Sequence, residues 1–282
     1  DKASKFPRAS LQRILGPCGD PEVEKEMLLL RYSPWPLPKK AEISCRYVDQ
    51  LDKRPLIEGF TFNIDPPGCQ DVDDVITISR MSDMKWQLTI SITDVATAIE
   101  EGSELDLYAK KVGQTLYPED KEPKHMLPPS ISTKELSLLK GQIRNTISLS
   151  LIWSPENGIE SSKWSCAKLM VDKAYTYKEA QEENSEEFLV LKQIVNQIAL
   201  MPRVTSEEWV ETLMIYYNSE AGKLLKANGK GILRHHSEPD MEKFASLSAI
   251  DPLLEKMAFS AASYVTSDVE GRHWGLKTDD YA

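Results

Sequence analysis

An acidic turn between two β-like segments is the feature that most constrains the fold of this chain. Residues 60–64 alternate apolar and polar side chains, a pattern typical of a strand with one buried face. A Pro-Pro-Gly turn interrupts the pattern at residues 66–68, and residues 75–80 are again rich in β-branched side chains. The segment therefore predicts two strands joined by a loop, with four carboxylates in the loop and at its edges: Asp65, Asp71, Asp73 and Asp74.

The carboxylate cluster predicts a cation site. Carboxylates this dense repel one another unless water or bound cations neutralise them, and hard oxygen ligands suit Mg²⁺ or Mn²⁺. In an extended segment Asp71 and Asp73 share one face, and Asp74 points away unless the loop turns, which Gly68 makes easy. Taken alone, the cluster is explained equally well by a solvated turn or a calcium-binding loop.

Composition narrows the class of protein. The 282 residues are 41% hydrophobic and 28% charged, which suits one large or two modest folded domains. We see no apolar run long enough to span a membrane and no signal peptide at the start, and the four scattered cysteines suggest reduced thiols inside a cell. The net charge of −10 argues against simple surface binding to nucleic acid. Residues 105–145 reverse that balance locally.

Periodicity and turn signals predict strands first and helices later. Strands are expected at 10–15, 60–64, 75–80, 86–93, 146–153 and 160–171, and residues 232–236 are a short strand or a connector. Helices are expected at 22–31, 105–112, 186–200, 206–227, 239–248 and 252–266. The segments 146–153 and 160–171 should pair antiparallel, and Ser206 is the expected N-cap of its helix.

These features, in this order, resemble the RNB catalytic domain of the RNase II/RNase R exoribonuclease family, which includes eukaryotic exosome-associated members. The family signature reads here as Ile64-Asp65-Pro66 followed by Asp71-Val72-Asp73-Asp74-Val75. Other family-like motifs stand at 92–95, 102–106, 114–118, 126–128, 136–144, 177–180, 214–218, 234–236 and 273–276. Residues 16–26 resemble the family's link from a cold-shock-type domain.

The resemblance implies an α/β (α+β) fold in which a mixed or antiparallel sheet is flanked by helices. Residues 1–20 would end an upstream cold-shock/OB-type β module, and residues 21–282 would form the RNB catalytic domain, incomplete at its C-terminus. Two departures matter: Thr212 stands where the family has a glutamate, and the family's arginine-bearing segment would lie beyond Ala282.

The resemblance also implies a function: metal-dependent 3′→5′ hydrolysis of single-stranded RNA, with release of nucleoside 5′-monophosphates. All four aspartates would be catalytic and would hold Mg²⁺, with Mn²⁺ as an alternative, and Asp73→Asn would be the most damaging change. Tyr117 would stack on the base at the RNA 3′ end. The other expected RNA contacts are Arg144, Lys110, Lys111, Lys124, Arg234 and His236.

The expected partners are single-stranded RNA and a helicase or exosome-like RNA-decay complex, with no membrane. The expected location is intracellular, with the cytoplasm favoured over the mitochondrion and nucleus. Two alternatives stay open. One is a catalytically impaired RNB-fold RNA-binding or scaffold subunit of an RNA-decay complex; the other is a calcium-stabilised structural domain.

Overall fold

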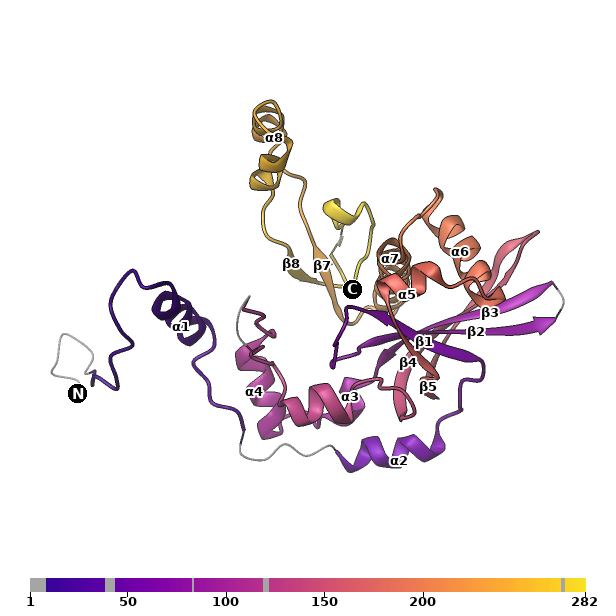
Figure 1. The fold of residues 1–282 in the computed structure, drawn as a ribbon, viewed down its shortest axis with the longest axis horizontal. Coiled ribbons are helices and arrows are strands. Elements are labelled where there is room, and N and C mark those ends of the chain that lie inside the picture. Colours follow the sequence, from indigo (N-terminus) through magenta and orange to yellow (C-terminus); the bar gives the residue numbers. More distant parts are fainter. Residues whose placement is uncertain (1–8, 39–43, 83, 119–121, 270–271) are drawn as a thin grey trace. The chain divides into compact units, whose positions relative to one another are not determined.

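The chain folds as two units, each built from two separate stretches of sequence (Figure 1). The computed structural model describes residues 9–38, 44–82, 84–118, 122–269 and 272–282. Unit 1 comprises Asp1–Gln50 and Asp94–Ser137, and unit 2 comprises Leu51–Thr93 and Leu138–Ala282. Within the described ranges, every helix is too short or too polar to cross a membrane.

Unit 1 is helical. Its elements are α1 (Pro21–Tyr32), most of α2 (Cys45–Lys53), α3 (Val95–Ala98), α4 (Glu104–Val112) and a π-helical turn, η1 (Ile131–Glu135). Helix α4 is well delimited, because the Ser103 side chain accepts a hydrogen bond from Asp106 N and Gly113 ends the helix at φ 74°. Its buried Leu105 belongs to a small apolar core of six side chains: Tyr47, Ala98, Leu105, Leu127, Ile131 and Leu136.

Unit 2 contains a six-stranded mixed sheet with strand order β5-β4-β3-β2-β1-β6. The strands are β1 (Phe60–Asp65), β2 (Asp74–Ser82), β3 (Lys85–Thr93), β4 (Ile143–Ser154), β5 (Gly158–Met170) and β6 (Lys173–Thr176). All neighbours pair antiparallel except β1 and β6, which run parallel. The predicted pairing of 146–153 with 160–171 is confirmed.

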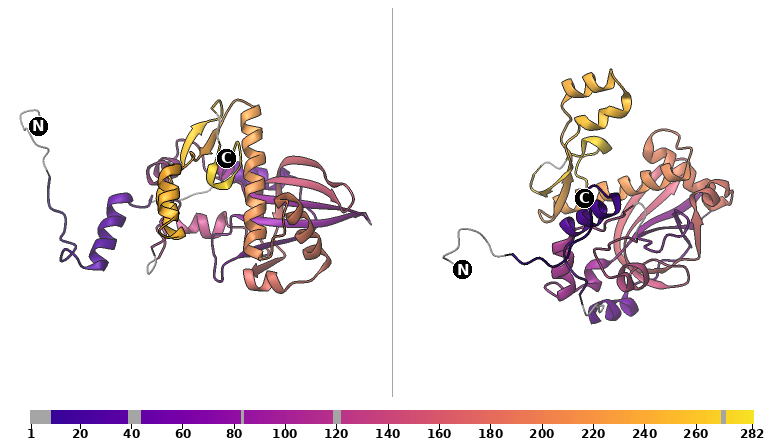
Figure 2. Two further views of the ribbon diagram at one scale, coloured as in Figure 1. Left: turned by 90° about the horizontal axis from the view of Figure 1, so that it is seen from above. Right: turned by 60° about the vertical axis from the view of Figure 1, so that its left-hand side comes forward.

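Helices α5 (Tyr177–Glu182), α6 (Glu186–Ala199) and α7 (Ser206–Ala227) complete the main core of unit 2. Helix α7 runs crosswise to the strands (Figure 2). Fully buried side chains from the sheet, such as Phe62 and Leu88, meet Phe188, Leu191 and Trp209 from the helices. Rings stack within this core, with Phe62 and Phe188 centroids 4.7 Å apart. Removing such a side chain leaves a cavity and typically costs about 3–5 kcal/mol.

Hydroxyl groups occupy alternate positions of the same strands. Thr61 and Thr77 bond through their hydroxyls at 2.8 Å, as do Ser91 and Ser148. These side chains are buried as deeply as the apolar ones. Each hydroxyl in such a cross-strand pair has the other as its hydrogen-bond partner. These polar side chains can therefore be buried in the sheet at little cost.

The C-terminal part of unit 2 is a small β-ribbon with helical additions. Strands β7 (Ile232–His235) and β8 (Ser263–Thr266) pair antiparallel. Between them lie α8 (Met241–Ser248) and the 3₁₀ turn η2 (Pro252–Ala258), and η3 (Trp274–Leu276) follows. An aromatic cluster links these pieces, including His236 against His273 with ring centroids 5.0 Å apart.

Three local predictions are wrong. Residues 10–15 form no strand, and within the described ranges no neighbouring strand pairs with them, as a strand requires. Residues 252–266 form no continuous helix: the 3₁₀ turn η2 ends at Ala258, and residues 263–266 form β8, which pairs with β7. The N-cap of α7 is Thr205, which forms a capping box with Glu208, so Ser206 is the first helical residue.

Candidate active site

The four aspartates lie at one end of the sheet of unit 2, where β1 passes into β2. Asp65 is the last residue of β1 and Asp74 is the first of β2, while Asp71 and Asp73 lie in the loop between them. Strands β1 and β2 are antiparallel, with Phe62 opposite Ile76. Continuing that register brings the end of β1 beside the start of β2, so Asp65 and Asp74 are neighbours in space.

The loop is held by its backbone. It reverses at Gly68, whose φ of 83° lies in the region that glycine adopts without strain. The Val72 side chain is buried in a small core, and its carbonyl accepts a hydrogen bond from Leu138 N at 2.9 Å. The Asp73 carbonyl accepts one from Thr93 N at 3.0 Å. Burial of Val72 therefore leaves Asp71 and Asp73, on either side of it, less buried than their neighbour.

Asp65 is further fixed by two neighbours in sequence and space. Asn63 donates a hydrogen bond from Nδ2 to Asp65 Oδ2 at 2.7 Å, as expected for side chains two residues apart on a strand. Parallel strand β6 pairs with β1, with Thr176 opposite Asp65. The end of β6 therefore lies beside the end of β1 that carries Asp65 and supports it by strand pairing.

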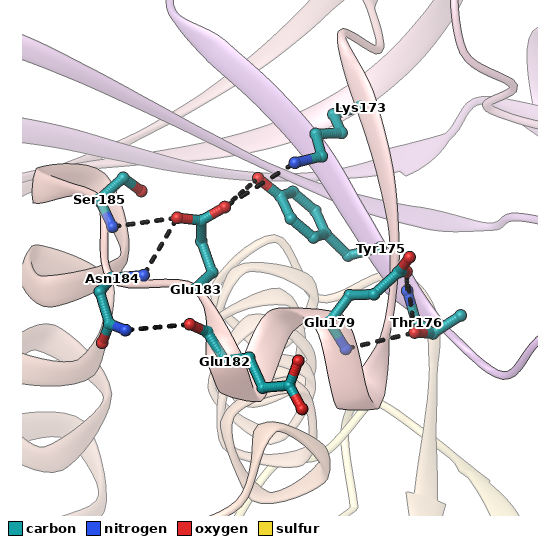
Figure 3. Close-up of polar contacts among 8 residues, drawn as sticks. All are labelled: Lys173, Tyr175, Thr176, Glu179, Glu182, Glu183, Asn184 and Ser185. Atoms are coloured by element: carbon teal, nitrogen blue, oxygen red, sulfur yellow. Dashed lines mark hydrogen bonds and ion pairs between the residues drawn. The ribbon is translucent and has the colours of Figure 1, made fainter.

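Side-chain contacts secure the junction of β6 and α5 (Figure 3). Thr176 and Glu179 form a capping box at the start of α5. The Tyr175 hydroxyl donates to Glu183 Oε2 at 3.0 Å, and Lys173 Nζ lies 3.8 Å from the same oxygen. This network fixes where β6 ends and α5 begins, beside the aspartates.

Burial and mutual repulsion raise the pKa of three of the aspartates. Partial burial, then the charges of Asp65 and Asp73, raises the pKa of Asp74 to about 7. Asp73 keeps part of its surface exposed to solvent. The surrounding protein nevertheless desolvates its carboxyl, and this desolvation, followed by the charges of Asp71 and Asp65, raises its pKa to about 6. Burial also raises the pKa of Asp65, although hydrogen bonds from Asn63 and from the Cys69 thiol oppose the rise. The carboxylates are therefore close enough to repel one another electrostatically.

A divalent cation fits the chemistry of this donor set. Four hard oxygen donors, three of them with a raised pKa, are stabilised by a positive charge among them. In the described part of the chain, however, no three His, Cys, Asp or Glu side chains already gather as a coordination shell. The carboxylates are thus close enough to interact but are not arranged as a preformed metal cage.

Two residues beside the aspartates carried no role in the sequence interpretation. The Cys69 thiol lies 3.7 Å from Asp71 Oδ1, and burial followed by the charges of Asp65 and Asp71 raises its pKa to about 12, so it stays protonated. Burial, then the charges of Asp65 and Asp74, raises the pKa of Tyr177. The sequence did offer one indication for Tyr177, because this residue begins the family-like motif at 177–180.

The structure also clarifies the position where the family glutamate is replaced. Thr212 is buried and donates its hydroxyl to the Glu208 carbonyl at 2.7 Å, a local bond within α7. Glu211, one residue earlier, lies 4.0 Å from Arg203 Nη1. Neither side chain contributes to the pKa shifts of the aspartates. Helix α7 thus offers no direct replacement at this position.

The predicted RNA contacts are divided between the units. Tyr117 is 67% exposed and belongs to unit 1, as do three lysines. Lys110 pairs with Asp106 at 2.8 Å, Lys111 lies 5.8 Å from the Trp35 ring centroid, and Lys124 donates to the Ser33 carbonyl.

The other predicted contacts, Arg144, Arg234 and His236, belong to unit 2. Arg144 Nη1 donates to the Ile143 carbonyl at 3.0 Å. His236 accepts a hydrogen bond from Gly275 N and donates to the Ser260 carbonyl, so its ring is held within the ribbon. The RNA roles of these side chains stay predictions.

Comparison with known proteins finds similarity to one protein family over a central stretch of the chain. Residues 53–188 match the RNB domain. The exosome complex exonuclease RRP44 homolog A of Arabidopsis thaliana is 29% identical over 196 residues, which cover 64% of this chain and 20% of that protein. The chain thus spans about a fifth of the length of this relative.

Solved structures share the fold. Mycoplasma genitalium RNase R in complex with ribose-methylated single-stranded RNA aligns with a TM-score of 0.75 at 16% identity, covering 97% of this chain and 55% of that one. Yeast Ssd1, described as a pseudonuclease, aligns with the same score and identity over 90% of this chain and 41% of its own. At this identity, the likeness establishes the fold alone.

Proposed function

Because residues 53–188 match the RNB domain, we propose that the chain belongs to a 3′→5′ hydrolytic exoribonuclease that degrades single-stranded RNA to nucleoside 5′-monophosphates. One observation carries the proposal: the RNB region places Asp65, Asp71, Asp73 and Asp74 around a single loop, where three of their pKa values are raised by burial and by one another. The similarity to an exosome complex exonuclease supports the same reaction class.

In this proposal, the four aspartates hold Mg²⁺, or Mn²⁺ in its place. Metal bound there supplies neutralisation of phosphate charge and a water of lowered pKa. Asn63 orients Asp65 through its hydrogen bond, and the backbone bonds of Val72 and Asp73 hold the loop in position. Asp73 has the exposed carboxylate of the set, so it is the ligand most accessible from solvent.

The proposal assigns the substrate contacts to side chains of both units. Tyr117 offers an exposed ring that can stack on any base, which suits an enzyme that must accept every nucleotide. Lys110, Lys111, Lys124, Arg144, Arg234 and His236 would contact phosphates along the RNA. We propose single-stranded RNA as the direct partner and an exosome-like decay complex, with or without a helicase, as the setting.

Labelled RNA tests the direction and the metal requirement together. Purified protein is incubated with 3′-labelled or 5′-labelled single-stranded RNA in Mg²⁺, and parallel reactions contain EDTA. The proposal expects the 3′ label to appear at once as a mononucleotide, and it expects EDTA to stop the reaction. Release of the 5′ label first, or activity that survives EDTA, would contradict it.

A non-catalytic RNA-binding or scaffold role is the second candidate. It is favoured by the structural likeness to Ssd1, described as a pseudonuclease. The four aspartates weigh against it, because they are retained together at one loop. The scaffold role predicts that the protein binds RNA and Mn²⁺ yet releases no nucleotide under any metal condition.

A further inference from the structure

A cavity in unit 1 lies apart from the sequence that bears the aspartates. It is formed by the segment 35–38 and by one face of α4, and its volume is about 550 Å³. We call it the Trp35 pocket; its principal lining residues are Trp35, Leu37, Glu104, Leu107, Tyr108 and Lys111. That volume is within the range of pockets that bind small organic ligands.

Tyr108 lines the pocket and carries an unsatisfied polar group. Its side chain is only 6% exposed, and its hydroxyl has no hydrogen-bond partner among the described residues. Buried hydroxyls in native proteins nearly always have a hydrogen-bond partner, because burying a polar group without one costs free energy. The hydroxyl itself is covered in the free protein, so a ligand in the pocket supplies that partner only when the ring turns to meet it. Burial also raises the pKa of Tyr108, so the hydroxyl stays protonated and able to donate.

Trp35 gives the pocket an aromatic wall that is already held in place. Its indole Nε1 donates a hydrogen bond to the Lys111 carbonyl at 3.2 Å, and the Lys111 ammonium lies 5.8 Å from the ring centroid. These contacts fix the ring, yet 41% of the residue remains exposed. A fixed, partly exposed indole next to a cation is a surface on which a flat base can stack.

We propose that the Trp35 pocket binds a nucleobase of single-stranded RNA as a second RNA subsite, separate in sequence from the aspartate loop. The base stacks on Trp35, the Tyr108 hydroxyl donates to an acceptor on the base edge, and the Lys111 ammonium contacts the adjoining phosphate. The Glu104 carboxylate repels phosphate and accepts base N–H groups, so the base enters and the phosphate stays outside. The choice of RNA as the ligand rests on the proposed function, whereas the existence of the pocket does not.

Two substitutions separate binding from folding. Trp35→Leu removes the stacking surface, and Tyr108→Phe removes only the hydroxyl. Affinity for a short fluorescent single-stranded RNA is measured by anisotropy in EDTA, which prevents hydrolysis. Tyr264→Leu, at a 72% exposed aromatic on β8, is the matched control. Thermal unfolding of each variant checks the fold, and Tyr108→Phe should melt at or above the parent temperature, because it removes a buried hydroxyl that has no partner in the described part of the chain.

The expected result is that Trp35→Leu weakens RNA binding about 5- to 150-fold, the equivalent of 1–3 kcal/mol for one stacked base. Tyr108→Phe should weaken it about 5-fold, and Tyr264→Leu should leave it unchanged. Parental affinity in both pocket variants, with RNA hydrolysis intact, overturns the subsite while the proposed function stands. A folded parent that binds no RNA overturns both, and a pocket that takes only a proline-rich peptide overturns the nucleobase assignment.

Discussion

Neutralising Asp74 should stabilise the metal-free protein at alkaline pH. The pKa of Asp74 rises from 3.8 to about 7 on folding, a change of roughly 3 pH units. At 1.36 kcal/mol per unit, ionising this carboxyl in the folded state costs at most about 4 kcal/mol. The side chain is partly exposed, so solvent screening reduces the expected gain for Asp74→Asn to about 1–2 kcal/mol at pH 8.

The raised pKa of Asp74 fixes the direction in which the stability of the folded protein changes with pH. The folded pKa of Asp74 lies above its unfolded value, so its stabilising effect is complete only below about pH 3.8. That effect is lost progressively as the pH rises towards 7, and little changes above that value. The parent should therefore lose stability between pH 5 and pH 8 in EDTA, and Asp74→Asn should lose less.

Urea unfolding in EDTA at pH 5, 6.5 and 8 measures the effect, with Glu182→Gln as a charge-matched control at an exposed position. The gain should appear in Asp74→Asn alone and should grow with pH. Adding Mg²⁺ should stabilise the parent and do little for the variant, which has lost one ligand. A gain that is equal at all three pH values would refute the argument from burial and repulsion.

Three further predictions concern the aspartate loop, its support and the C-terminal ribbon. Asp73→Asn should lower RNA hydrolysis at least 100-fold while anisotropy in EDTA shows unchanged RNA affinity, and residual parental turnover would exclude Asp73 from the site. Thr176→Ala should cost about 1 kcal/mol in urea unfolding, because it removes the capping box of α5; a change below the error of the measurement would contradict that role. Burial and the nearby His236 lower the pKa of His273, so its stabilising effect is present above pH 6.5 and is lost as the pH falls. His273→Gln should unfold with a flatter pH profile between 5 and 7, and a profile as steep as the parent's would count against this.

Alternation and turn residues were sufficient to predict the strands that carry the aspartates. The segments at 60–64, 75–80 and 86–93 all became strands, because each alternates apolar side chains over a buried face and ends at a turn former. The loop position of Asp71 and Asp73 followed from the same pattern. The resemblance identified the family correctly, and the match at residues 53–188 confirms it.

Long-range contacts could not be predicted from the sequence. Strand β6 has four residues, too few for a periodic signal, yet its pairing with β1 supports Asp65. The raised pKa values of Asp73 and Asp74 depend on packing around the loop, which local patterns do not encode. The buried Tyr108 hydroxyl, which has no hydrogen-bond partner among the described residues, could not be predicted either, because its helix position only indicates that the ring faces inward.

The parallel pairing of β1 with β6 has a consequence for the timing of folding. The partner of Asp65 in that register is Thr176, so the aspartate loop and its support are separated by more than a hundred residues. A ribosome releases the aspartates long before it releases the strand beside them. The contacts from Thr93 and Leu138 can form earlier, but Asp65 lacks its β6 neighbour until then, so the site takes its final form only after synthesis has passed β6.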